Sequence, residues 1–360
     1  MGAWTNAGKE EGGFLRLRLS TLPLVACLLL ALALCVAPVR AQPTPPDTSY
    51  RVYTGAGAPA SLDAVVAAMD TVEVVFLGEV HNDPTAHALH RALLARAHRR
   101  YGAADSAAGR SVALSLESFE RDVQPVLDEY LAGLITEEHF LASSRPWRNY
   151  RAAYRPLVEY AKAHELAVLA ANAPRRYVNR VARLGPSSLD SLPHAAEQWL
   201  PPLPPPPPSD AYRAKWKRHA HAAMTVDSSG ASPHGASPDT TALDSARVHD
   251  DPHHGASADN MLRAQALWDA TMAYAIATHL MDTPRALVLH VTGGFHVSEG
   301  TGTPEQLARY RPSARPLVVV MRPVDDVAAF DPDAHAALGD FVVLTDAARV
   351  RERPPTEPGK

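Results

Sequence analysis

The stretch Val74–His81 constrains the fold more than any other part of the chain. It begins with a run of valine, phenylalanine and leucine and then presents the carboxylate of Glu79 and the imidazole of His81. A short apolar run bounded by turn residues is typical of a strand buried on both faces of a sheet. Asp83 and Pro84 follow as the N-cap and first residue of a helix. The pattern predicts a strand, a loop with polar groups and a helix.

Five more apolar runs have the length of buried strands, and helical periodicity fills most of the segments between them. They are residues 112–116, 167–171, 286–291, 316–321 and 341–345. Strands that alternate with helices are typical of a parallel sheet with helices on its faces. The sequence therefore predicts an α/β fold with a mostly parallel central sheet, helical cover and an additional helical region.

The amino terminus carries the features of an export signal. Arginines precede an apolar block at residues 22–37, and Val39-Arg40-Ala41 resembles a small-residue cleavage site, so residues 1–41 are predicted to be a signal peptide. An alternative is that residues 24–27 form a lipobox and that Cys27 becomes a lipidated amino terminus attached to the membrane. Both interpretations predict an exported protein of the periplasm or cell envelope, and the second makes it lipid-anchored.

Composition divides the rest of the chain. Residues 42–60 are rich in proline and glycine and are predicted to be a linker, followed by a single α/β domain made of residues 61–185 and 259–347. Between its two parts, residues 186–258 hold 12 of the 32 prolines and 7 of the 17 histidines. This composition predicts a largely disordered insertion, because it offers little apolar surface to bury. Residues 348–360 are predicted to be a disordered tail.

Four of the predicted strands end in polar side chains. Parallel strands bring their carboxyl ends to one edge, so these side chains are expected to share one pocket: Glu79 and His81, Glu117, Asn172 and His296. Each also has an ordinary structural interpretation, such as an ion pair between Glu117 and Arg121. Two carboxylates and two imidazoles would suit a divalent metal with an open position, or acid–base catalysis. The candidate metal ligands are Glu79, His81, Glu117 and His296.

An aromatic group lies in the additional helical region. Trp147, Tyr150 and Tyr154 have the spacing of a helix face and suit a buried core. Alternatively, they line an apolar slot for a flat ligand, in which a tyrosine oxygen could ligate iron.

Several motifs together resemble the ChaN-type haem-binding lipoprotein family. They are Leu77–Pro84, Ser115–Phe119 with Arg121 and Gln124, Ala171–Pro174, Trp268–Ala273 and Gly293–His296. That family is similar to the Tiki metalloproteases and erythromycin esterases, which share two Gly-x-x-His motifs and a pair of glutamates. In this sequence the matching motifs are Gly78–His81 and Gly293–His296, and the matching glutamates are Glu79 and Glu117.

The resemblance implies an exported protein that binds haem and serves haem or iron uptake at the cell envelope, with haem shared between the subunits of a homodimer. The axial ligand, a tyrosine or a histidine, stays open. The candidate haem-binding residues are His81, His87, Arg121, Tyr150, Tyr154, Asn172 and His296. The alternative is a metal-dependent hydrolase whose catalytic residues are Glu79, His81, Glu117 and His296. A formal net charge of −4 gives no reason to expect nucleic acid as a partner.

Overall fold

The computed structural model describes residues 45–46, 48–102, 109–229 and 257–351, with the backbone alone over residues 222–229. The predicted signal peptide, residues 1–41, lies outside the described residues, and so does Cys27. In the part of the chain that is described, no helix has both the length and the apolar character needed to span a membrane.

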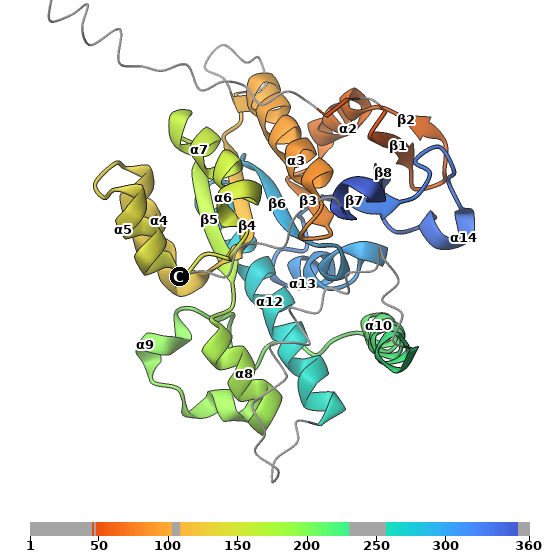
Figure 1. Ribbon diagram of the computed structural model, residues 1–360. Helices are drawn as coiled ribbons and strands as arrows, with labels where there is room; N and C mark the ends of the chain where they lie inside the picture. Colours follow the sequence, from red (N-terminus) through yellow and green to blue (C-terminus); the bar gives the residue numbers. More distant parts are fainter. Residues whose placement is uncertain (1–44, 47, 103–108, 230–256, 352–360) are drawn as a thin grey trace, which may run out of the picture. The chain divides into compact units, whose positions relative to one another are not determined.

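A single eight-stranded sheet forms the centre, in the order β2-β1-β8-β7-β3-β6-β4-β5 (Figure 1). The strands from β3 to β8 run parallel, whereas β1 pairs antiparallel with both β8 and β2. This confirms the predicted α/β fold with a mostly parallel sheet. The bounds are β1 Tyr50–Thr54, β2 Pro59–Ala60, β3 Val74–Glu79, β4 Val112–Glu120, β5 Ala167–Asn172, β6 Leu287–Gly293, β7 Pro316–Val324 and β8 Phe341–Asp346.

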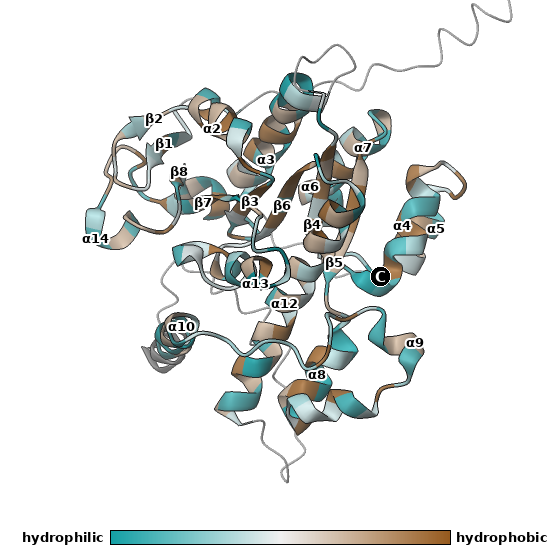
Figure 2. Ribbon diagram, turned by 180° about the vertical axis from the view of Figure 1, so that it is seen from behind, coloured by the Kyte–Doolittle hydropathy of each residue, from teal (hydrophilic) through white to brown (hydrophobic). Residues whose placement is uncertain are grey.

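Helices cover both faces of this sheet, and the alternation of side chains along the strands decides which residues meet which helices. Val75 and Leu77 of β3 pack in the core with α3 and α7, whereas Val74 and Phe76 pack with α12 and α13. In Figure 1, α3 and α7 lie above the strands and α12 and α13 lie below them. Figure 2 shows that the most hydrophobic segments are the central strands, which are buried by both layers.

The α3 layer contains α2 (Leu62–Ala68), η1 (Met69–Thr71), α3 (Pro84–Ala97), η2 (His98–Gly102), η3 (Arg121–Val123), α4 (Gln124–Leu131), α5 (Glu137–Ser144), α6 (Tyr150–Ala153) and α7 (Arg155–Ala163). The helices of the second half are α8 (Arg175–Leu184), η4 (Pro186–Ser191), α9 (His194–Glu197), α10 (Asp210–Ser229), α12 (Ala258–Asp282), η5 (Gly294–His296), η6 (Ser298–Gly300), α13 (Thr303–Tyr310), α14 (Pro332–His335) and α15 (Ala347–Arg351).

Helix α3 begins where its capping signal predicts. The Asp83 carboxylate accepts hydrogen bonds from the backbone N–H groups of Thr85 and Ala86 at 2.8 and 3.1 Å, and Pro84 occupies the first turn. The other oxygen of Asp83 accepts from the hydroxyl of Thr345 at 2.5 Å, which ties the start of α3 to the end of β8. The loop between β3 and α3 is therefore held on both sides.

The prediction of a linker over residues 42–60 is wrong for its second half, because this segment contains β1 and β2. Strand β1 pairs with β8 from Tyr50↔Thr345 to Thr54↔Phe341, and its Val52 and Tyr53 are buried. The prolines and glycines on either side of β1 dominate the composition of residues 42–60. They mark turns next to a sheet strand rather than a free connection.

The predicted insertion is ordered over residues 186–229, and residues 230–256 lie outside the described residues. Leu189 and Leu200 are buried against α8 and α12, and α10 buries Tyr212 and Lys215. The few large side chains of this Pro-rich segment therefore stand at packing positions, which an average over its composition does not show. Similarly, α15 includes the first residues of the predicted tail 348–360, and residues 352–360 are not described.

Candidate functional site

A buried carboxylate surrounded by imidazoles lies at the carboxyl end of β3. The Oε1 atom of Glu79 accepts a hydrogen bond from the Tyr154 hydroxyl at 2.5 Å and lies 3.1 Å from Nδ1 of His81. Its Oε2 atom lies 3.3 Å from Nε2 of His87 and 3.2 Å from Nδ1 of His90. These five residues, called here the Glu79 centre, are held by β3, the loop that follows it, α3, and the junction of α6 with α7.

The spacing along α3 explains two of these imidazoles. His87 and His90 are three residues apart, so they lie on one face of the helix, which is turned toward the sheet. His81 is fixed separately, because its ring meets Trp147 edge to face at 4.6 Å and its backbone oxygen accepts from the Asn149 side chain at 2.7 Å.

Burial alone would raise the pKa of Glu79. The charge of His87 and the hydrogen bonds from His81, His87 and His90 outweigh burial and hold the pKa of this carboxyl well below its usual range. Glu79 is therefore an ionised group at neutral pH, and the surrounding imidazoles supply the compensating interactions at this buried position.

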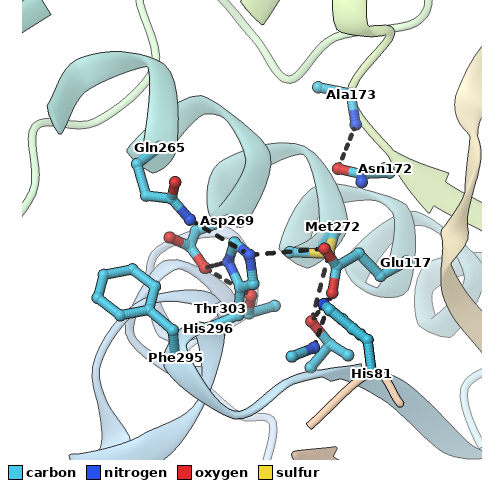
Figure 3. A network of polar contacts seen from close by, with 12 residues as sticks. His81, Glu117, Asn172, Ala173, Gln265, Asp269, Met272, Phe295, His296 and Thr303 are labelled. Carbon is cyan, nitrogen blue, oxygen red and sulfur yellow. Dashed lines mark hydrogen bonds and ion pairs between the residues drawn. The ribbon is translucent and has the colours of Figure 1, made fainter. Parts of the chain in front are cut away.

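A second polar group, called here the His296 centre, lies on α12 and the loop after β6 (Figure 3). Nδ1 of His296 lies 2.8 Å from Oδ1 of Asp269, and its Nε2 lies 3.6 Å from Oε1 of Glu117 and 3.3 Å from Nε2 of Gln265. The hydroxyl of Thr303 donates to Asp269 at 2.9 Å. An imidazole held between two carboxylates has the arrangement of an acid–base relay.

Backbone groups of β6 and of the loop after it position Glu117 and His296 closely. Glu117 accepts from the Thr292 hydroxyl and from the Gly293 N–H, both at 2.7 Å, which fixes its carboxylate on β6. Gly302 has a φ of +76°, and a Cβ there would lie 2.4 Å from the backbone oxygen of His296. Only glycine, which has no Cβ, allows the backbone at position 302 to lie this close to that of His296.

Helix α10, which belongs to the predicted insertion, covers the His296 centre and contributes two of its contacts. The Tyr212 hydroxyl donates to Oδ2 of Asp269 at 2.5 Å, and the buried Nζ of Lys215 donates to the backbone oxygens of Phe295 and Ser298 at 2.7 and 2.8 Å. Burial lowers the pKa of Lys215 to about 8. Sequence reasoning missed Asp269, Tyr212 and Lys215 as parts of the site. The only signal for Asp269 was its place in a family motif. The other two lay in a short helix expected at residues 212–224 within a largely disordered insertion, and that helix is present as part of α10.

The two centres point to opposite faces of the sheet. Glu79 follows Val75 and Leu77 at intervals of two and faces α3, whereas Glu117 follows Ala113 in the same way and faces the α12 side. Strand β6 also lies between β3 and β4. The prediction of one four-ligand metal site is therefore wrong. Among the described residues, no group of three or more His, Cys, Asp or Glu residues is arranged to hold a metal ion.

The other candidate haem-binding residues are Tyr150, which lies next to Tyr154 of the Glu79 centre, Asn172 and Arg121. Tyr150 and Tyr154 are almost fully buried in the aromatic core, so in this structure neither presents its ring to a cleft. Asn172 ends β5 and accepts a hydrogen bond from the N–H of Ala173. Arg121 follows β4; burial lowers its pKa, and the neighbouring Tyr274 of α12 opposes that shift.

A cleft of about 560 Å³ opens beside α12. An apolar wall, an imidazole, a phenol and two carboxylates line it, from Asp190, His194, Glu197, Gln198, Leu200, Pro201, Pro202, Leu203 and Tyr274. None of the residues predicted to form the site lines this cleft. Apart from Tyr274 of α12, its lining residues lie in the segment that the sequence predicted to be an insertion.

Comparisons with known proteins bear on this arrangement. The chain resembles in fold the structure of ChaN of Campylobacter jejuni with cofacial haem, at a TM-score of 0.55 and 13% sequence identity, covering 83% of this chain and 98% of that chain. The type III effector HopBA1 gives a TM-score of 0.40 at 13% identity, covering 84% and 99%. An erythromycin esterase in its open conformation gives 0.39 at 11%, covering 83% of each chain.

No curated protein matches the chain in sequence. The profile of the family described as haem-binding uptake, Tiki superfamily, ChaN matches residues 65–307, which includes both polar centres and the cleft. This match covers more than half of the chain and agrees with the resemblance seen in the sequence motifs. The chain belongs to the ChaN haem-binding uptake family of the Tiki superfamily.

Proposed function

We propose that this protein binds haem and that the cleft beside α12 is its haem site. Family membership carries the proposal of haem binding, since the family is one of haem-binding uptake proteins. The relative from Campylobacter jejuni, whose fold this chain shares, binds haem cofacially. We assign the site to the cleft because the Glu79 and His296 centres are buried inside the fold, whereas the cleft is open.

The residues of the cleft fit haem. Its volume of about 560 Å³ lies in the range of cofactor pockets, and Leu200 and Leu203 with the adjacent prolines form an apolar wall. Tyr274 and His194 supply the two side-chain types that ligate haem iron in many proteins. Asp190 and Glu197 would repel carboxylates, so we expect the haem propionates to point away from them toward solvent.

Substitutions in the cleft test this location. We expect Tyr274→Phe, or His194→Ala if the imidazole is the ligand, to weaken hemin binding by about tenfold or more, because an iron–ligand bond is lost. The measurement is an absorption titration of the full chain with hemin. Tyr310→Phe is the matched control, since its ring lies 5.3 Å from that of Tyr274 but does not line the cleft. Wild-type titrations for both cleft variants would contradict the location.

We further propose that the protein is exported and acts in the periplasm or cell envelope in haem or iron uptake, as a homodimer that shares haem. The signal-like features of residues 1–41 support export, and the family's description as haem-binding uptake proteins supports a role in uptake. Cleavage after Ala41 predicts a mature protein that begins at Gln42 without lipid. Intact-mass measurement on protein from its own envelope decides, because a mass with diacylglycerol on Cys27 would instead indicate a lipid anchor.

A further inference from the structure

A basic cluster with no assigned role lies where α3 and α7 end. It consists of Arg91, His98 and Arg99 from α3 and the π-helical turn η2, and of Tyr160 and His164 at the end of α7. Helix α3 starts at the carboxyl end of β3 and runs back for 14 residues, about 20 Å. The cluster therefore lies at the edge of the sheet opposite the polar strand ends.

Ring contacts hold the cluster together. The Arg91 guanidinium stacks over the Tyr160 ring at 3.9 Å from its centroid, and the His164 ring lies 4.2 Å from that ring and 4.9 Å from the ring of His98. A guanidinium held against an aromatic face keeps its N–H edge directed outward at low entropic cost. The cluster is thus arranged before any ligand arrives.

Among the described residues, no carboxylate compensates the charge of Arg91 and Arg99. Four arginines lie within ten residues, and two of them have acidic partners: Arg96 pairs with Asp63, and Arg100 with Asp70. In the described part of the chain, neither Arg91 nor Arg99 forms an ion pair. The charged groups that shift the pKa values of Arg91, His98 and Tyr160 are cationic or aromatic side chains, with no carboxylate among the described residues.

His98 also contacts the hydroxyl of Tyr160. Burial raises the pKa of Tyr160, so its hydroxyl stays protonated, and it lies 3.1 Å from Nδ1 of His98. When this hydroxyl donates to Nδ1, the imidazole carries its proton on Nε2. His98 then has an N–H donor on Nε2, and the charge of Arg99 acts on both His98 and Arg91.

We propose that Arg91, His98, Arg99 and His164 form a binding site for a phosphate-type anion, separate from the haem cleft. Two guanidinium groups and two imidazoles can donate several charge-assisted hydrogen bonds to the oxygens of one such group. The stacked Tyr160 ring forms the floor of the site. A soluble phosphate compound and the headgroup of an anionic phospholipid share this chemistry.

Isothermal titration of the full chain with inorganic phosphate, at constant ionic strength, tests the site. We expect saturable binding that weakens about tenfold or more in Arg99→Gln and in His164→Gln, since each removes charge-assisted hydrogen bonds. Arg100→Gln is the matched control, because this neighbouring arginine is paired with Asp70. Circular dichroism checks that each variant is folded.

Co-sedimentation with vesicles separates the two sources. Binding to phosphatidylglycerol vesicles, but not to phosphatidylcholine vesicles, that is lost in Arg99→Gln assigns the site to a lipid headgroup. Binding of free phosphate alone assigns it to a soluble ligand. The proposal is overturned if neither probe binds, or if Arg100→Gln weakens binding as much as Arg99→Gln does. These results are independent of hemin binding at the cleft.

Discussion

Glu79→Gln is expected to lower the free energy of unfolding by about 3–5 kcal/mol at neutral pH, because removing one partner of a buried charge cluster leaves the others without compensation. The substitution keeps the shape of the side chain and removes only its charge. His81, His87 and His90 would then lie buried around a neutral amide that cannot satisfy all of them. Urea unfolding followed by circular dichroism measures the change.

The pH dependence of this effect follows from the lowered pKa of Glu79. Above about pH 4.3, the ordinary pKa of glutamate, the carboxyl is ionised in the folded and unfolded chain and its full stabilisation is present. As the pH falls toward the lower pKa of the folded state, the unfolded chain takes up its proton first, so this stabilisation is lost. The stability difference between wild type and Glu79→Gln should therefore shrink below that pH.

Glu129→Gln serves as the control, because Glu129 is exposed on α4. We expect it to change the free energy of unfolding by no more than about 0.5 kcal/mol. Equal effects for Glu79→Gln and Glu129→Gln would contradict the view that the Glu79 centre is a buried, charge-compensated cluster.

Lys215→Ala is expected to destabilise the protein by about 3 kcal/mol, because it removes a buried side chain and leaves two buried carbonyls without their donor. Nζ of Lys215 is what holds the backbone of Phe295 and Ser298 against α10. The effect should also be local: hydrogen exchange should accelerate in residues 293–302, which carry His296.

Lys217→Ala is the matched substitution on the same helix. Lys217 is exposed and lies two residues away, so its loss removes a lysine from α10 without touching the loop after β6. Similar stability and exchange for the two variants would show that α10 does not stabilise the His296 centre.

The sequence predicts the sheet well because its strands are buried on both faces. Runs such as Val74–Leu77 and Leu287–Val291 are apolar at every or nearly every position, and their short length between turn residues favours strands over helices. Strand β1 was not predicted because Tyr50–Thr54 is a short strand between turn residues. Its partner strand β8 lies 287 to 295 positions later in the chain.

The site was harder to predict because its geometry depends on strand order. Glu79 and Glu117 both end strands, yet whether they meet depends on which strand separates them and on which face each side chain points to. Strand β6 enters from the second half of the chain and provides Thr292 and Gly293 as partners for Glu117. No local pattern near Glu117 carries that information.

The residues of the cleft could not be predicted from the sequence either. Nothing in the helical pattern of α12 distinguishes Tyr274 from its neighbours. His194 lies in a Pro-rich segment whose composition indicates a loop. Their proximity arises from the packing of Leu189 and Leu200 against α12. Only the folded chain brings a phenol, an imidazole and an apolar wall to one cleft.

The most direct test of the account is an absorption titration of the purified, full-length wild-type protein with hemin. Haem binding predicts a Soret band displaced from that of free hemin, which grows to saturation at a fixed ratio of hemin to protein. If well-folded protein gives only the spectrum of free hemin across the titration, the protein does not bind haem and its proposed function is wrong.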